Sequence, residues 1–163
     1  MEAWVTENTT QDQQLTEKGI KTLHQVWLSP LYSWAGNYRT VEMSKGDFAF
    51  ASSRFIPNLM EEFEFKFLKQ YTPCAGYSLN ELVEALARVH VEFILIHPFR
   101  EGNGRLSRVL SNIMVFQAGY PSLDYSLLTD KNKYITAIQA GVSQNYSLME
   151  NLFREMLESS IKN

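Results

Sequence analysis

Residues 97–108 read His-Pro-Phe-Arg-Glu-Gly-Asn-Gly-Arg-Leu-Ser-Arg and lie between two stretches in which apolar residues recur every three or four positions. That spacing is typical of α-helices with one buried face. The first stretch opens at Ser78 or Asn80, and the second closes at Gly119, a residue type that commonly follows the end of a helix. Because Pro98 cannot continue a helix, the segment is expected to form a turn between two long helices.

The rest of the chain is also mostly helical in pattern. Thr16 is expected to cap a helix that Pro30 stops. The apolar residues at helical spacing in the other expected helices are Ile20, Leu23 and Trp27; Leu59, Phe63 and Phe67; Tyr134 and Ile138; and Leu148, Leu152, Phe153 and Met156. Residues 40–43 and 48–51 instead indicate two short strands around a turn at 44–47. The patterns predict a mainly α fold, a bundle of about six helices with one short β-hairpin.

Length and composition predict a single domain. The chain has 163 residues, of which 45% are hydrophobic and 20% are charged, and its formal net charge is −3. A chain of this length can bury a core without disulfides or metals. We expect the domain over residues 16–163, preceded by a polar N-terminal arm over residues 1–15. The composition excludes a disordered chain, and the mild acidity argues against general nucleic-acid binding.

Cysteine usage and hydropathy bear on the compartment. Cys74 is the single cysteine, so no intramolecular disulfide can form, as is usual in a reducing compartment. No positive charge adjoins Cys74 to make its thiol reactive. The acidic N-terminus lacks the pattern of a signal peptide, and no apolar run is long enough to cross a membrane. We expect a cytoplasmic protein with no membrane partner, and delivery into another cell stays open.

Residues 97–108 have the composition of an anion-binding turn. Gly102 and Gly104 flank Asn103, and these residue types tolerate positive φ, so successive N–H groups can form a concave nest for phosphate oxygens. The helix that begins after Gly104 adds its unpaired amides and the positive end of its dipole. Arg105 and Arg108 lie three positions apart and are therefore neighbours on one face, able to hold a polyphosphate.

Two further residues in the segment can supply chemistry. Glu101 is a single carboxylate of the kind that Mg²⁺ binds together with phosphate and water oxygens. His97 ends the preceding helix, where a neutral imidazole can accept a proton from a hydroxyl. Each feature alone also fits a solvated turn, but the eight fixed residue types together arise by chance in on the order of 10⁻¹⁰ of windows. The segment therefore indicates a nucleotide phosphotransfer site.

The segment resembles the motif of the Fic family. The positions that match this motif without a departure are His97, Phe99, Glu101, Gly102, Asn103, Gly104, Arg105 and Arg108. Residues 31–40 are similar to the family's run before its flap hairpin, and the resemblance covers roughly residues 16–158. The family is mostly helical, and its members typically transfer AMP from Mg·ATP to a Ser, Thr or Tyr hydroxyl of another protein. The resemblance thus implies a protein adenylyltransferase that uses ATP, Mg²⁺ and a target protein.

The resemblance also implies a role for each motif position. The implied roles are His97 as general base, Phe99 as a core anchor, Glu101 as the Mg²⁺ ligand, Gly102, Asn103 and Gly104 as phosphate-binding residues, Arg105 as the cation that neutralises the leaving pyrophosphate, and Arg108 as the residue that positions the γ-phosphate. Related kinases carry Lys where this chain has Gly104. Glycine at this position therefore favours AMP transfer.

Residues outside the motif have weaker implied roles. The expected hairpin is similar to the family's flap, which binds the target by adding a strand to an exposed edge. The implied flap residues are Met43, Ser44, Lys45, Gly46 and Phe48, although Phe48 could equally well cover the core. Tyr134 lies where family members often place an aromatic residue near the adenine, and core packing explains it nearly as well. His90 is interpreted as a hydrogen-bonded interior histidine rather than a metal ligand.

The sequence lacks a common inhibitory motif of the family, Ser/Thr-x-x-x-Glu-Gly/Asn, whose glutamate pairs with the second arginine. Glu precedes Gly or Asn only at Glu7, Glu101 and Glu150, and none of these has Ser or Thr four positions earlier. Either the enzyme is not self-inhibited, or a separate small, antitoxin-like protein supplies the glutamate to Arg108.

Two other interpretations of function stay open. The same site could remove AMP, or transfer UMP, phosphocholine or phosphate, because the motif recognises phosphates more clearly than bases. The fold could also serve as a non-catalytic nucleotide-binding interaction module. The intact His97, Glu101 and Arg108 argue against that module, because binding alone needs no base beside a carboxylate.

Overall fold

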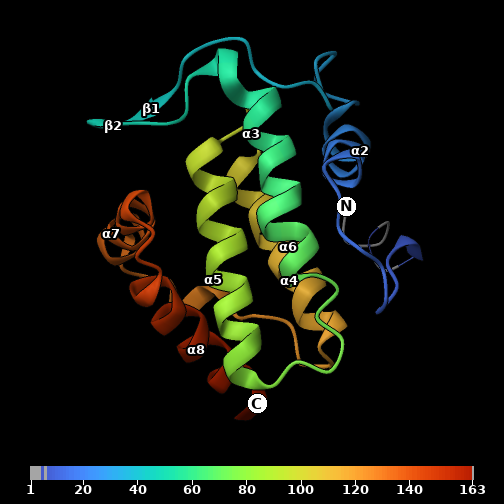
Figure 1. The fold of residues 1–163 in the computed structure, drawn as a ribbon, viewed down its shortest axis with the longest axis vertical. Coiled ribbons are helices and arrows are strands. Elements are labelled where there is room, and N and C mark those ends of the chain that lie inside the picture. Colours follow the sequence, from blue (N-terminus) through green and yellow to red (C-terminus); the bar gives the residue numbers. More distant parts are fainter. Residues whose placement is uncertain (1–4, 6, 163) are drawn as a thin grey trace.

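A buried central helix organises the structure, a computed structural model that describes residue 5 and residues 7–162. This helix, α5 (Leu79–Ile96), contacts four others: α3 (Ile56–Phe63), α6 (Asn103–Gln117), α7 (Lys131–Ala140) and α8 (Ser147–Lys162). Figure 1 shows α5 in the middle, with α3 and α6 on one side and α7 and α8 on the other. The predicted mainly helical fold is confirmed.

The ends of α5 follow from its sequence. Ser78 and Glu81 form a capping box, in which the Ser78 Oγ accepts from the Glu81 N–H and the Glu81 carboxylate accepts from the Ser78 N–H. At the other end the helix stops at Ile96, because His97 adopts a left-handed conformation and Pro98 follows. The expected boundaries of this helix are confirmed, and they place His97 at the C-terminal end of the most buried element.

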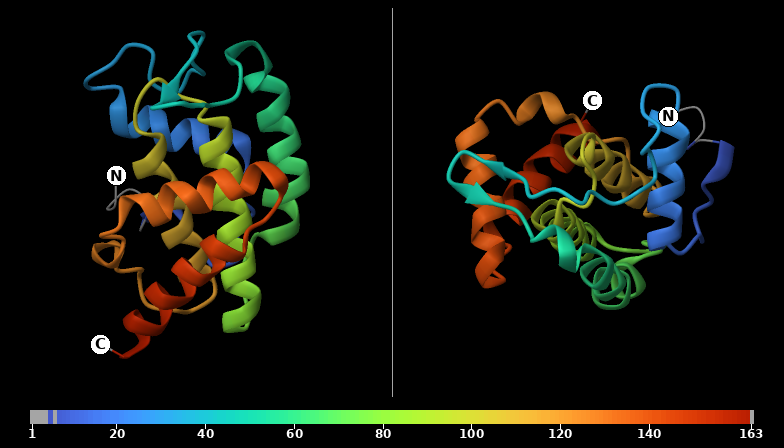
Figure 2. Two further views of the ribbon diagram at one scale, coloured as in Figure 1. Left: turned by 90° about the vertical axis from the view of Figure 1, so that its left-hand side faces the viewer. Right: turned by 90° about the horizontal axis from the view of Figure 1, so that it is seen from above.

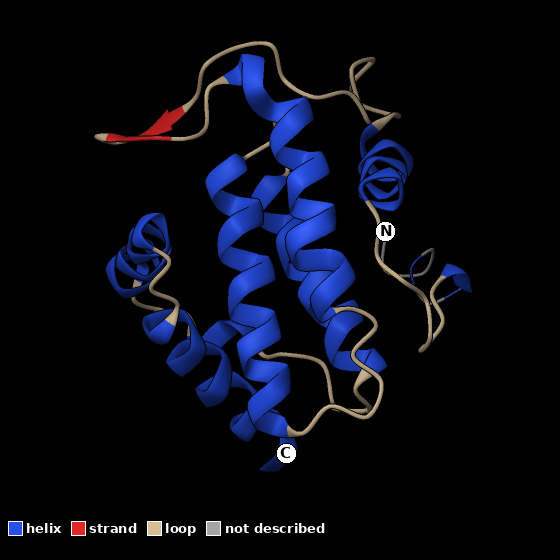
Figure 3. Ribbon diagram, in the orientation of Figure 1, coloured by secondary structure: helices blue, strands red, loops and turns tan. Residues whose placement is uncertain are grey.

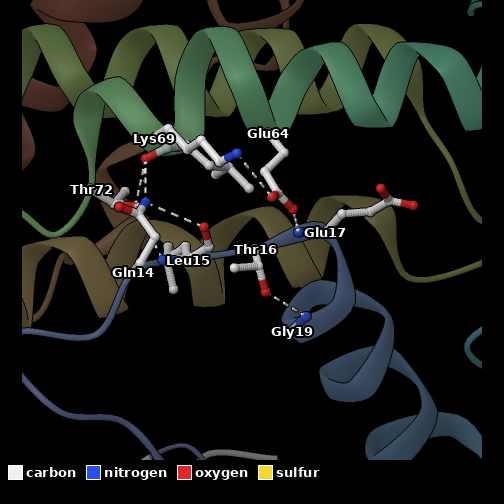
Figure 4. A network of polar contacts seen from close by, with 9 residues as sticks. Gln14, Leu15, Thr16, Glu17, Gly19, Glu64, Lys69 and Thr72 are labelled. Atoms are coloured by element: carbon white, nitrogen blue, oxygen red, sulfur yellow. Dashed lines mark hydrogen bonds and ion pairs between the residues drawn. The ribbon is translucent and has the colours of Figure 1, made fainter.

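The first helix, α2 (Glu17–Leu28), begins where Thr16 predicts. The Thr16 Oγ1 accepts a hydrogen bond from the Gly19 N–H at 3.0 Å. The helix α3 continues through a π-helical segment (Glu64–Leu68) into α4 (Lys69–Tyr71), so that the three form one long helical segment. A network of polar contacts holds the N-terminal end of α2 against this segment (Figure 4). The Glu17 N–H donates to the Glu64 carboxylate at 2.7 Å, which fixes the N-terminal end of α2 against this helical segment.

The N-terminal arm contributes to the core at its last residue. Leu15 is buried, and its N–H donates to the Thr72 Oγ1, as does the amide of Gln14. Residues 1–4 and 6 lie outside the described residues. The domain boundary at residues 15 and 16 stays a prediction.

The predicted hairpin exists, but its expected extent was wrong. β1 (Ser44–Lys45) pairs with β2 (Phe48–Ala49) in antiparallel register, so two residues expected in the turn form a strand (Figure 3). The turn is tighter than expected because Gly46 adopts a φ of 59°. Beyond the strands the Phe50 N–H still donates to the Met43 carbonyl.

The hairpin projects from the bundle toward α7 (Figure 2). It therefore overhangs the end of the bundle where α5 ends and α6 begins. No helix within the described part of the chain is long and apolar enough to cross a membrane.

Candidate active site

His97 is held in one tautomer at the end of α5. Its Nδ1 lies 3.3 Å from the Ile94 carbonyl oxygen, which can only accept, so Nδ1 carries the proton and Nε2 keeps its lone pair. Burial of the ring lowers the pKa of His97 to about 4. The imidazole is therefore neutral near pH 7, with one nitrogen ready to accept a proton.

Phe99 and Asn103 fix the turn that follows. The Phe99 ring is fully buried and stacks on the ring of His24, with centroids 3.8 Å apart. The Asn103 side chain closes the turn, since its Oδ1 accepts from the Phe99 N–H at 2.9 Å and its Nδ2 donates to the Phe99 carbonyl at 2.7 Å. The predicted anchor role of Phe99 fits this packing, whereas the side chain of Asn103 is buried and already paired.

His24 supports the turn from α2. Its Nε2 donates to the Glu101 carbonyl at 3.1 Å, and its Nδ1 accepts from the Gly36 N–H at 2.8 Å. Burial lowers the pKa of His24, which keeps the ring neutral in the single tautomer that these two bonds require. The sequence does not reveal this role of His24, because no spacing rule connects a histidine in α2 to a turn so far along the chain.

Gly102 forms the bend that precedes α6. Its φ is 85°, and a Cβ built on it would lie 2.7 Å from the Trp27 ring. Asn103 and Gly104 already belong to α6, so the expectation of positive φ holds at Gly102 alone. Because the first amides of a helix have no partner within it, the start of α6 presents N–H groups at this bend.

The charged residues of the motif lie on the exposed side of the turn. The Arg105 Nη2 lies 3.0 Å from the Glu101 Oε1, and both side chains are exposed. The Arg105 guanidinium also lies over the Trp27 ring, and the Arg108 guanidinium lies over the Tyr125 ring. Surface pairs of this kind are weak, so both arginines can turn toward a bound anion.

An open depression of about 330 Å³ brings the predicted residues together. It is lined by Met43, His97, Arg100, Glu101, Gly102, Asn103, Gly104, Arg105 and Arg108. A smaller, largely apolar cavity of about 120 Å³ adjoins it, since His97 and Gly104 line both. Lys45, Phe48, Phe50 and Tyr134 line this second cavity. The motif is therefore surrounded by three of the predicted flap residues, Met43, Lys45 and Phe48, and by the predicted aromatic residue Tyr134. The other two predicted flap residues, Ser44 and Gly46, lie in the exposed hairpin.

Two residues singled out outside the motif are buried. The His90 Nε2 lies 2.8 Å from the Tyr134 Oη and its Nδ1 lies 3.3 Å from the Ser111 Oγ, which confirms the prediction of a hydrogen-bonded interior histidine. Cys74 is also buried, and burial raises the pKa of its thiol to about 12. The thiol is therefore unreactive, as the absence of a neighbouring positive charge in the sequence predicts.

A neutral imidazole, the N-terminal end of a helix and two arginines surround one depression on a helical bundle, an arrangement typical of proteins that transfer nucleotides. The chain belongs to the Fic/DOC family, whose model matches residues 14–115. It is 26% identical to the "Probable protein adenylyltransferase Fic" of Escherichia coli over 86% of this chain and 69% of that protein. It is 27% identical to the "Protein adenylyltransferase VbhT" of Bartonella schoenbuchensis over 85% of this chain and 28% of that protein.

Solved structures agree with the family assignment. The BepC protein of Bartonella tribocorum, solved with bound AMPPNP, matches 95% of this chain and 80% of that chain with a TM-score of 0.73 and 25% identity. The FIC domain of the Bep8 protein from another Bartonella matches 96% of this chain and 80% of that chain with a TM-score of 0.77 and 22% identity, which shows the shared fold.

Proposed function

We propose that this chain is a protein adenylyltransferase, which transfers AMP from Mg·ATP to a Ser, Thr or Tyr hydroxyl of a target protein and releases pyrophosphate. One observation carries the proposal. The half-buried, neutral imidazole of His97 lines the same depression as Glu101, Arg105, Arg108 and the N-terminal end of α6. A base beside a polyanion site is what attack by a hydroxyl on a phosphorus atom requires.

The proposed reaction is an in-line displacement at the α-phosphorus. The target hydroxyl oxygen forms a bond to the α-phosphorus while its proton passes to the His97 Nε2. The bond between the α-phosphorus and the bridging oxygen breaks, and pyrophosphate leaves with the electron pair. Arg105 and Arg108 balance the growing negative charge on the leaving group, and the amides at the start of α6 hold the phosphates.

The adjoining apolar cavity suits the base of the nucleotide. Phe48 and Tyr134 line it beside Gly104, which also faces the depression. An aromatic and aliphatic lining next to an anion site fits a flat ring joined to phosphates. This arrangement supports the proposed place of Tyr134 near the adenine.

Glu101 fits the single carboxylate that Mg²⁺ takes when phosphate and water oxygens supply its remaining ligands. The Gly102 N–H and the Arg105 guanidinium both donate to its Oε1. Its Oε2 accepts no hydrogen bond from any described residue. When bound, Mg²⁺ would supply positive charge to the phosphates. Glu101 is the residue that would hold it, and Arg105 would then exchange this carboxylate for phosphate.

The hairpin is the proposed docking site for the target. Over the described residues β1 pairs with β2 alone, so its other edge offers unpaired backbone groups. Met43 at its base lines the depression next to His97. A target strand added to this edge would carry its hydroxyl to the base, with main-chain bonds supplying the affinity.

Arg108 is also the proposed point of inhibition by a separate small protein. Among the described residues no carboxylate forms an ion pair with it. A glutamate from such a partner would occupy the place of the γ-phosphate. We place the whole reaction in the cytoplasm, where Mg·ATP is abundant.

The proposal is tested by incubating the purified protein with α-labelled ATP, Mg²⁺ and a cell lysate. We expect labelled protein bands with the wild type and none with His97→Ala, while calorimetry shows that His97→Ala still binds ATP. Equal labelling by the mutant would overturn the catalytic assignment. Loss of ATP binding by His97→Ala would overturn its role as a base that acts after binding.

A further inference from the structure

Arg39 is a buried arginine whose side chain, among the described residues, donates hydrogen bonds only to main-chain carbonyls. It is 1% exposed. Its guanidinium donates from Nε to the His97 carbonyl at 2.6 Å, from Nη1 to the Val41 carbonyl at 2.7 Å, and from Nη2 to the carbonyls of Ala51 at 2.6 Å and Ile96 at 3.2 Å. Its own N–H donates to the Pro98 carbonyl at 2.9 Å.

The four carbonyls belong to two parts of the site. Val41 and Ala51 lie at the two ends of the hairpin, one before β1 and the other after β2. Ile96 and His97 lie at the end of α5, where the last carbonyls of a helix have no partner within it and carry the negative end of its dipole. One guanidinium therefore joins the base of the hairpin to the residue that carries the catalytic imidazole.

Further contacts join the hairpin to the end of α5. The Phe50 ring stacks on the His97 imidazole, with centroids 3.8 Å apart. The Ala51 N–H donates to the Leu95 carbonyl at 3.1 Å. The segment that follows β2 is thus fixed to the end of α5 through the backbone of Ala51 and the side chain of Phe50.

We propose that Arg39 is a positioning residue of the transfer reaction, which fixes the hairpin against the end of α5 so that the target strand and the His97 imidazole keep one relative position. The inference rests on the proposed function, in which the hairpin binds the target. A displacement of about 1 Å between hydroxyl and base can lower the rate of a reaction by about 10²-fold. Lysine could not replace Arg39, because a single ammonium group lacks the planar fork that reaches carbonyls on several sides.

The position of the hairpin can be measured without substrate, because the chain has 3 histidines and their ring signals can be assigned separately by NMR. The test compares the wild type with Arg39→Met and Arg39→Lys. Arg54→Gln is the matched control, since Arg54 lies just after the hairpin and is exposed. In both Arg39 variants we expect the His97 ring signals to lose the ring-current shift caused by Phe50, while His90 and His24 keep their shifts.

The kinetics of AMP transfer provide a second measurement on the same variants. We expect kcat for AMP transfer to protein to fall by about 10²-fold, with the KM for ATP changed by less than about threefold. Unchanged His97 signals in both variants would overturn the proposal. So would a joint change of all three histidines, because Arg39 would then support the whole fold. The spectra need neither ATP nor a target, so the absence of AMP transfer by the wild type would reject the proposed function alone.

Discussion

The imidazole of His97 lies nearly flat on the phenyl ring of Phe50, with ring centroids 3.8 Å apart and ring planes 12° apart. Phe50 follows β2 directly, so the hairpin covers one face of the base. Covering this face removes water from the imidazole, and desolvation is the largest cause of its low pKa. The hairpin therefore contributes to the acid–base property of the residue beside which it would place the target.

Replacing Phe50 should change the pH dependence of the reaction. In the wild type the base stays neutral down to its pKa of about 4, so kcat/KM should keep its value until the pH approaches 4. Phe50→Leu exposes the imidazole and should move its pKa toward about 6.5, the usual value for histidine. The variant should then lose activity between pH 6.5 and 5, a range where the wild type remains active.

The measurement is kcat/KM against pH together with an NMR titration of His97. Phe55→Leu is the control, because Phe55 is exposed beyond the hairpin. Identical acid limbs for the wild type and Phe50→Leu would contradict the account.

Two glycines of the motif should respond oppositely to the same substitution. Gly102→Ala forces an L-residue to a φ of 85° and presses its Cβ against Trp27. It should destabilise the protein by about 1–3 kcal/mol and weaken ATP binding. Gly104→Ala meets no atom within 4 Å and lies in a helix, so it should leave stability equal or up to about 1 kcal/mol greater.

Urea unfolding of both glycine variants and calorimetry of Gly102→Ala with ATP provide the test. Equal stability of the two variants would show that the bend at Gly102 does not require glycine.

Removal of His24 should loosen the turn that carries Glu101. His24→Ala loses two hydrogen bonds and the stack on Phe99 from a fully buried site, so unfolding free energy should fall by about 2–4 kcal/mol. Val26→Ala is the control on the exposed side of the same helix and should change stability by less than about 0.5 kcal/mol. Urea denaturation of both variants measures the difference, and equal losses would contradict this role of His24.

His90 should make stability depend on pH. Burial lowers its pKa to about 3 in the folded state, whereas the unfolded value is about 6.5. Because the unfolded chain then binds more protons, the stabilising contribution is complete above pH 6.5 and falls as the pH drops toward 3. The loss from this group between pH 6.5 and 5 should be about 2 kcal/mol.

The comparison of His90→Gln with the wild type isolates this effect. The free energy of unfolding measured in urea at several pH values should show a shallower decline for the variant. A decline of the same slope in both proteins would show that His90 is not the source.

The helices could be predicted because their signals are local. Thr16 and Ser78 cap α2 and α5 as expected, through bonds to amides three positions away. The hairpin was harder, because its strands are two residues long and their extent depends on the turn at Gly46. Val41 was expected in a strand, but its carbonyl instead accepts a hydrogen bond from the Arg39 side chain.

The candidate site shows the same division between local and distant signals. The motif residues are contiguous, and the depression brings them together as the sequence indicated. The supports of the motif could not be predicted, because His24 and Arg39 act through backbone carbonyls of residues far along the chain. The structural role of the Asn103 side chain, which closes the turn on Phe99, could not be predicted from the sequence either.

The most direct test of the central claim follows which phosphorus of ATP moves to protein. The purified chain is incubated with Mg²⁺, a cell lysate and either α-labelled or γ-labelled ATP, with His97→Ala as the control. The account predicts labelled protein from the α position only, and none from the mutant. Label from the γ position only would mean that the nucleotide lies reversed and that the protein is a kinase, which would contradict it.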